Sequence, residues 1–149
     1  MAEDKKIAIG ADHAGFELKE KIKPLLTEIG YEVIDFGTNS TDSVDYPLIA
    51  KSLATSVASK NPQKGILICG TGIGMSIAAN KIKGIIAAHC CDVETAKLAR
   101  QHNNSNILTI GGRITDSELA KEIIKTWLNT DFEGGRHQRR VQEIRELER

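Results

Sequence analysis

The chain has 149 residues, 40% of them hydrophobic, and its 20 basic and 20 acidic side chains give a formal net charge of +0 at pH 7. A chain of this length has the size of one ordinary globular domain, so residues 1–149 are expected to form a single domain with a substantial core. The balanced charge removes any strong electrostatic case for binding nucleic acid or an anionic membrane surface, so local charge must select any ligand.

In chain order, apolar runs typical of buried strands alternate with segments of helical periodicity. They are the strand Lys6–Ala11, helix Phe16–Ile29, strand Glu32–Phe36, helix Pro47–Ser59, strand Gly65–Cys69, helix Ser76–Lys81, strand Ile85–His89, helix Val93–His102, strand Asn106–Ile110 and helix Asp116–Trp127. Five strand–helix units imply a parallel sheet covered by helices on both faces. The expected fold class is therefore α/β, with three layers.

A last helix is expected over Arg136–Glu148, after a turn that contains two glycines. Its apolar stripe consists of Val141, Ile144 and Leu147, and it is narrow. Such a stripe can dock on another subunit as readily as on the core of its own chain.

The cysteines and the amino terminus indicate a cytoplasmic protein. Cys69, Cys90 and Cys91 form no Cys-x-x-Cys pair and no spacing typical of a zinc site, so reduced thiols are expected. The charged amino terminus leads straight into an apolar run and does not resemble a signal peptide. No stretch approaches the roughly 18 consecutive apolar residues that a membrane helix needs.

The third strand ends on Cys69, and three of the next five residues, Gly70 to Gly74, are glycines. This pattern places a thiol beside bare backbone N–H groups, which can hold an oxyanion and stabilise a thiolate. A nucleophile or base beside an anion hole is a catalytic layout. The alternative is a small buried residue at the end of a strand, followed by a tight turn.

Polar residues also follow the other strands, and ligands of open parallel sheets bind beyond the carboxyl ends of the strands. Asp12 and His13 follow the first strand, and Arg113 follows the fifth. Asp12 is a favoured helix cap, a role that can coexist with ligand binding. His13, at a helix start, is placed to meet a phosphate or a sugar hydroxyl, or it is solvated.

The fourth helix ends on His102, which Asn103 follows. A helix of about ten residues that runs antiparallel to the strands spans roughly 15 Å, so His102 is expected at the edge of the sheet opposite Cys69. If both residues serve one site, they come from different subunits. The alternative is a structural role, a histidine favoured by the helix dipole with an asparagine cap.

In the last helix, Arg136 and Arg140 are four residues apart and share a face. Two guanidiniums on one face can grip a phosphate through forked hydrogen bonds. The alternative is a solvated charged helix. The other lysines and arginines are expected to form ordinary surface, and Met75 and Trp127 are expected in the core.

Six motifs in the same order resemble the type B ribose-5-phosphate isomerases: Asp12-His13, Asp45-Tyr46-Pro47, Cys69 to Gly74, Ala78 to Lys81, Arg100 to Asn103 and Gly134 to Arg140. The resemblance extends over essentially the whole chain. It implies a Rossmann-like fold and the interconversion of ribose 5-phosphate and ribulose 5-phosphate in the pentose phosphate pathway. It also implies a homodimer that uses neither metal nor cofactor, and it leaves open whether dimers pair further.

Carried over by position, the resemblance makes Cys69 the base that moves a proton between C2 and C1, and His102 the acid that opens the furanose ring. It places Asp12 on the sugar and assigns Thr71 to the hydroxyl proton. The implied anion hole is Gly70, Thr71, Gly72, Ile73 and Gly74, and the implied ligands of hydroxyls and phosphate are His13, Asn103, Arg113, Arg136 and Arg140. One branch of the family has a glutamate base where this chain has Met75, so the chain resembles the cysteine branch.

Two alternatives remain open. Within the same fold, the substrate could be a six-carbon sugar phosphate such as galactose 6-phosphate or allose 6-phosphate. From a different class, the Gly70-x-Gly72-x-Gly74 spacing is typical of a nucleotide-binding module without turnover, with Asp92 about twenty residues further on. That match is imperfect because Met75 stands where the third glycine of the dinucleotide motif belongs.

Overall fold

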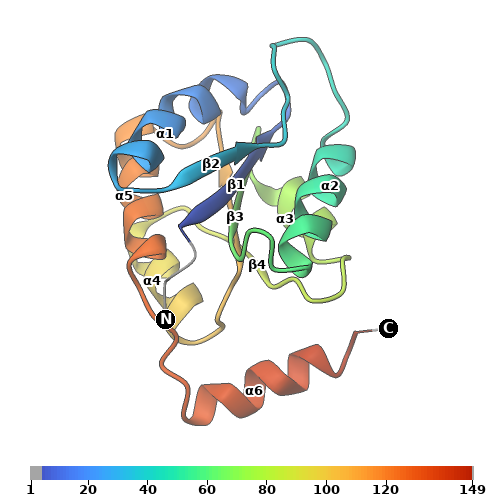
Figure 1. Cartoon of the computed structure of the whole chain (residues 1–149), viewed down its shortest axis with the longest axis vertical. Helices are drawn as coiled ribbons and strands as arrows, with labels where there is room; N and C mark the ends of the chain where they lie inside the picture. Colours follow the sequence, from blue (N-terminus) through green and yellow to red (C-terminus); the bar gives the residue numbers. More distant parts are fainter. Residues whose placement is uncertain (1–4, 149) are drawn as a thin grey trace.

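A sheet of parallel strands lies at the centre of the protein, whose computed structural model describes residues 5–148 (Figure 1). Its five strands are β1 (Lys6–Ala11), β2 (Glu32–Asp35), β3 (Gly65–Cys69), β4 (Ala87–His89) and β5 (Ile107–Gly111). They are ordered β2-β1-β3-β5-β4, and every neighbouring pair is parallel. The predicted parallel α/β fold is confirmed.

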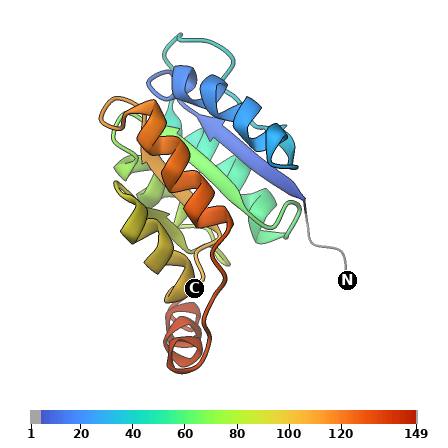
Figure 2. The same ribbon diagram turned by 90° about the vertical axis from the view of Figure 1, so that its left-hand side faces the viewer.

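Helices cover both faces of this sheet. One face carries α1 (Phe16–Glu28), α4 (Val93–Gln101) and α5 (Ser117–Leu128), which lie side by side in Figure 2. The other face carries α2 (Tyr46–Ala58) and α3 (Ile73–Ala79). The last helix, α6 (Arg136–Arg145), lies outside these layers, on the side where the strands begin (Figure 1). Within the described part of the chain, no helix has the length and apolar character needed to span a membrane.

The central strand β3 contributes apolar side chains to the core on both faces of the sheet. All five of its residues are buried, and successive side chains point to opposite faces of the sheet. Ile66 and Ile68 join the cluster under α1, α4 and α5, whereas Leu67 and Cys69 join the cluster under α2 and α3. The thiol therefore faces the layer that contains the glycine loop and α3.

The direction of winding reverses between β1 and β3. From β1 the chain passes through α1 to the edge strand β2, and from β3 it passes through α3 to the opposite edge strand β4. The two strand ends are adjacent, because the backbone N–H of Asp12 donates to the carbonyl of Ile68 at 3.1 Å. A crevice at such a reversal is the usual ligand site of open α/β sheets.

Two predicted starts were wrong. Helix α3 begins at Ile73 rather than Ser76, because Gly72 adopts φ +84° and serves as the N-cap. Strand β4 begins at Ala87 rather than Ile85, because the backbone N–H and carbonyl of Ile86 form hydrogen bonds with Asn106. The N–H of Asn106 donates to the carbonyl of Ile86 at 3.0 Å, and its Oδ1 accepts from the N–H of Ile86 at 2.9 Å.

The predicted end of the last helix was also wrong. Helix α6 stops at Arg145 rather than Glu148. Oε2 of Glu148 instead accepts from the backbone N–H of Gly84 at 3.0 Å, which ties the segment after α6 to the loop before β4. The remaining element boundaries agree with the predicted ones to within one or two residues.

Candidate active site

A cavity of about 400 Å³ opens where the winding reverses. Its walls come from the loop after β1, the start of α2, the end of β3 and the start of α3, through Asp12, Tyr46, Cys69, Gly70, Thr71, Ile73, Gly74 and Ile77. The structure thus brings the predicted acid, thiol and glycine loop to one place, and it adds an aromatic ring that the sequence did not assign.

Cys69 lies at the floor of this cavity. The residue is only 4% exposed, and the backbone N–H of Gly72 points at its Sγ from 3.2 Å. An N–H donor aimed at sulfur interacts more strongly with a charged acceptor than with a neutral one, so it can stabilise negative charge that develops on the sulfur. The geometry provides a sulfur that can take up and return a proton.

The glycines are required by close packing over the loop. A Cβ atom on Gly72 would lie 2.7 Å from the ring of His89, and one on Gly74 would lie 2.6 Å from the ring of Tyr46. Both distances are too short for any side chain to be added without movement. Glycine therefore lets the two rings pack against the loop while the N–H of Gly72 stays directed at Cys69.

Asp12 lines the cavity and closes the turn that precedes α1. The residue is 5% exposed, and its Oδ1 accepts from the N–H groups of Ala14 and Gly15 at 3.0 and 3.1 Å. These bonds hold the carboxylate at the start of the turn that leads into α1. The predicted helix cap was wrong, because the N-cap of α1 is Gly15 and no side chain caps that helix. Asp12 closes the turn before the helix instead, and its role on a ligand stays a prediction.

His13 contacts the loop after β2, and Arg113 lies beside the glycine loop. Nδ1 of His13 accepts from the N–H of Val44 at 3.2 Å, so the proton of the neutral ring belongs to Nε2. Nη1 of Arg113 would lie 3.8 Å from a Cβ atom on Gly70, and the backbone N–H of Arg113 donates to the carbonyl of Gly70 at 3.0 Å. A guanidinium thus accompanies the glycine loop, where it would attract an anion.

A second group of predicted site residues lies around the end of α4. The rings of His102 and His137 are stacked, with centroids 4.2 Å apart. Oε1 of Glu133 lies 3.9 Å from Nε2 of His102 and 3.5 Å from Nε2 of His137. Partial burial, followed by the charges of His102, Arg136 and Arg140, lowers the pKa of His137 despite the opposing charge of Glu133.

The two groups lie at opposite edges of the sheet. His102 follows the end of α4, and the same loop continues to Asn106, whose carbonyl accepts from the N–H of Gly65 at 3.0 Å. Gly65 begins β3, whereas Cys69 ends it. Figure 1 shows α6, which carries Arg136 and Arg140, on that same side of the sheet. A single chain therefore does not bring His102, Asn103, Arg136 or Arg140 to Cys69.

Among the described residues, His102, Glu133 and His137 are a candidate metal-binding group, because one ligand atom from each lies within 4.8 Å of the others. The two ring planes are only 13° apart. A metal ion must lie in the plane of each imidazole that binds it, so the stacked rings would have to turn before they could share one.

The sequence interpretation did not assign Tyr46, His89 or His137 to the site. Tyr46 carried a signal, since it belongs to a motif of the resemblance and follows the second strand. His137 carried the same kind of signal, because it lies in the motif Gly134 to Arg140. His89 carried none, because its contact with Gly72 joins segments distant in the chain.

A family model described as Ribose/Galactose Isomerase matches residues 7–144. Ribose-5-phosphate isomerase B of Escherichia coli (strain K12) is 52% identical over 144 residues, which are 97% of each protein. A solved structure of a ribose 5-phosphate isomerase from Thermotoga maritima is 54% identical, has a TM-score of 0.94, and is matched over 97% of this chain and 100% of that chain. A D-erythrulose-4-phosphate isomerase of Pectobacterium atrosepticum is 45% identical over 139 residues, 93% of this chain and 91% of the relative. The chain therefore belongs to the ribose/galactose isomerase family of sugar-phosphate isomerases.

Proposed function

We propose that this protein interconverts D-ribose 5-phosphate and D-ribulose 5-phosphate through an enediolate, in the cytoplasm and in the non-oxidative branch of the pentose phosphate pathway. The names of relatives at 52% and 54% identity support this substrate. The observation that carries the mechanism is the N–H of Gly72 directed at Sγ of Cys69 from 3.2 Å, at the floor of the cavity.

In the proposed reaction, the Cys69 thiolate removes the proton from C2 of the open-chain aldose and returns it to C1. The hydroxyl proton passes from O2 to O1 with the help of Thr71, which lines the same cavity. Backbone N–H groups of the glycine loop stabilise the negative charge that develops on oxygen, and each well-aimed donor contributes about 3 kcal/mol to transition-state stabilisation. Sulfur remains a base throughout and forms no bond to the sugar.

Cys69→Ala tests the assignment of the base. Isomerisation is expected to fall at least about a thousandfold while ribose 5-phosphate still binds, because the variant loses proton transfer and little else. Cys91→Ser is the matched control, since Cys91 is exposed and outside the cavity. Turnover like that of the wild type in Cys69→Ala would refute the assignment.

We further propose that the acid and the phosphate ligands come from a second copy of the chain. His102 would protonate the ring oxygen of the furanose, while Arg136 and Arg140 would bind the phosphate. The support for this composite site is the placement of these residues at the edge of the sheet opposite Cys69. A homodimer with two such sites would bring both groups together.

Mixing two inactive variants tests the composite site. Cys69→Ala and His102→Ala homodimers are each expected to be inactive, but a mixed dimer would contain one intact site. Random exchange of subunits should then restore about one quarter of the wild-type activity, because half of the dimers carry one working site of two. No recovery after verified subunit exchange, or a fully active monomer at high dilution, would contradict the composite site.

The length of the sugar is the main alternative. One relative, which is 45% identical to this chain, is named for D-erythrulose 4-phosphate, a sugar phosphate with one carbon fewer than ribose 5-phosphate. Comparing kcat/KM for four-, five- and six-carbon sugar phosphates is expected to favour ribose 5-phosphate. Membership in a family of isomerases argues against the alternative of a nucleotide-binding module without turnover.

A further inference from the structure

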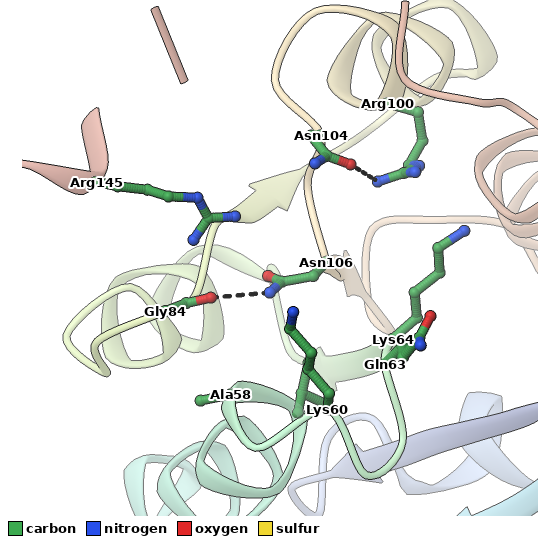
Figure 3. Close-up of a pocket in the computed structure, with 10 residues that line it drawn as sticks. Ala58, Lys60, Gln63, Lys64, Gly84, Arg100, Asn104, Asn106 and Arg145 are labelled. Carbon is green, nitrogen blue, oxygen red and sulfur yellow. Dashed lines mark hydrogen bonds between the residues drawn. The ribbon is translucent and has the colours of Figure 1, made fainter. Parts of the chain in front are cut away.

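A second cavity, of about 560 Å³, lies at the edge of the sheet opposite Cys69 (Figure 3). It is bounded by the end of α2, the segment before β3, the end of α4 and the loop after it, and the end of α6. No residue that lines it also lines the cavity at Cys69. Its volume is in the range of sites for small molecules.

The charges around this cavity have one sign. Lys60, Lys64, Arg100 and Arg145 line it, and none of its described lining residues is acidic. The whole chain carries equal numbers of basic and acidic side chains, so four cations around one cavity are a local excess. The carboxylate of Glu148 accepts from the backbone N–H of Gly84 at 3.0 Å and places one negative charge beside the cavity, which leaves the four cations in excess. Converging cations repel one another unless an anion lies between them.

Arg100 forms a fixed wall of the cavity. The residue is only 7% exposed, and its guanidinium donates to the carbonyl of Thr130 at 3.1 Å, to Oδ1 of Asn104 at 3.0 Å and to the carbonyl of Ser105 at 2.6 Å. Burial lowers the pKa of Arg100, and the charge of Asp131 opposes this shift. These contacts satisfy the guanidinium with neutral oxygens, and the charge of Asp131 offsets only part of the positive charge of the four cations that line the cavity, so this excess favours an anion there.

Lys60 and Arg145 supply charge at the mouth. Figure 3 shows both side chains extending into the cavity from opposite walls. Lys60 holds φ +60°, a left-handed conformation that is unfavourable for a residue with a side chain. Arg145 comes from the last residue of α6, so the cavity is closed by a helix outside the main layers.

We propose that this cavity binds a polyphosphorylated small molecule, with Arg100 at its wall and Lys60 and Arg145 on the phosphates. Several cations spread around one cavity suit an anion with more than one phosphate better than a single phosphate, which one or two guanidiniums can hold. The site differs from the catalytic cavity in place and in residues.

Calorimetry of the full-length protein with tripolyphosphate and with ATP, at about 0.15 M salt, tests the proposal. Saturable binding is expected, and Lys60→Gln and Arg145→Gln should each weaken it about tenfold, because each removes a charge-assisted hydrogen bond. Arg139→Gln is the matched control, as it removes the same charge from α6 outside the cavity. If ATP binds more tightly than tripolyphosphate, the cavity also contacts the nucleoside. If the two bind equally, the phosphates alone account for the affinity. Either result supports the site.

Saturating ribose 5-phosphate is expected to leave tripolyphosphate binding unchanged. Displacement by ribose 5-phosphate would place the probe in the Cys69 cavity and overturn the proposal. So would a lack of saturable binding, or equal affinities of the wild type, Lys60→Gln and Arg145→Gln. Cys69→Ala should bind tripolyphosphate as the wild type does, so a failure of this proposal and a failure of the proposed reaction are separately visible.

Discussion

The imidazole rings of His102 and His137 stack with centroids 4.2 Å apart and planes 13° apart. The charge of His102 is one cause of the lowered pKa of His137, after partial burial. Two imidazolium ions at this distance repel each other, so the pair holds one proton far more readily than two. The pKa of His137 therefore responds to the charge of the proposed ring-opening acid.

His137 is expected to titrate below its ordinary value of 6.5. Its folded pKa is lowered, so the unfolded chain binds more protons just below the unfolded value, and stability rises with pH in that window. The contribution is fully present above about pH 6.5 and is lost as the pH falls toward the folded pKa. NMR titration of the ring protons measures the shift, and a His137 that titrates at or above 6.5 would contradict the prediction.

Removing the stack should also affect turnover. His137→Ala frees the His102 ring to rotate and is expected to lower kcat about tenfold with little change in KM, because a misplaced catalytic group loses rate. His137→Phe keeps a flat ring in the stack and should retain most of the activity. Equal loss in both variants would show that orientation by stacking is not the cause.

Gly72→Ala tests the close approach over the catalytic loop. The added Cβ would meet the ring of His89 at 2.7 Å on a backbone with φ +84°. The combined strain and overpacking should cost more than about 2 kcal/mol of stability. Displacing the N–H that faces Cys69 should lower kcat/KM about a hundredfold.

Gly30→Ala is the matched control for that variant. Gly30 has φ +102°, and nothing lies within 4 Å of its added Cβ. Only the backbone strain remains, so about 1 kcal/mol of stability and no activity should be lost. Urea unfolding and steady-state kinetics of the two variants check both expectations. Similar losses in the two would argue against the close packing of Gly72 on the His89 ring and on the backbone of Ile110, which would lie 2.8 Å from the added Cβ.

A buried ion pair joins α1 to the end of β2. Nζ of Lys19, a fully buried side chain, lies 2.6 Å from Oδ2 of Asp35. Burial raises the pKa of Asp35, but hydrogen bonds from Lys19, the N–H of Gly37 and Lys23 outweigh it and hold the pKa below its ordinary value. The stability from this shift is present above the unfolded pKa of about 3.9 and is lost as the pH falls below it.

Asp35→Asn is therefore expected to destabilise the protein by about 2–3 kcal/mol at neutral pH, because it leaves a buried cation with one carboxylate partner fewer. The difference from the wild type should shrink near pH 3, as measured by urea unfolding. Glu118→Gln is the control, since its side chain is 79% exposed and its pair with Lys121 spans 3.4 Å. That change should cost less than about 0.5 kcal/mol, and an equal cost in both variants would refute the role of burial.

Cys91 and Cys90 should differ in their reactivity. Burial raises the pKa of Cys90 to about 11, with the charges of Asp92 and Cys91 adding to the shift against a hydrogen bond from Thr95. Iodoacetamide near pH 8 should therefore label the exposed Cys91 first and leave Cys90 unmodified, since the thiolate is the reactive form. Peptide mass spectrometry follows each site, and early labelling of Cys90 would contradict its burial.

The sequence by itself determined the elements and much of the chemistry. Periodicity in short segments predicted all five strands and the helices between them, because side-chain spacing is a local property. The polar residues at the carboxyl ends of the strands could be recognised for the same reason. The sequence therefore predicted that Asp12 and Cys69 lie at the same edge of the sheet. The element boundaries that were predicted wrongly depend on residues distant in the chain. At the start of β4, for example, the backbone N–H of Ile86 donates to the side chain of Asn106.

Only the tertiary structure decided what lies next to what. The order β2-β1-β3-β5-β4 makes β1 and β3 neighbours and so sets Asp12 beside the end of β3, whereas the position of His102 at the opposite end of the strands was already predicted from the sequence. The same packing closes the rings of Tyr46 and His89 over the glycines. The packing also brings four basic residues that are far apart in the chain around one cavity, namely Lys60, Lys64, Arg100 and Arg145. The sequence alone did not indicate that they lie together. Such contacts arise from strand order and helix packing, which local periodicity does not encode.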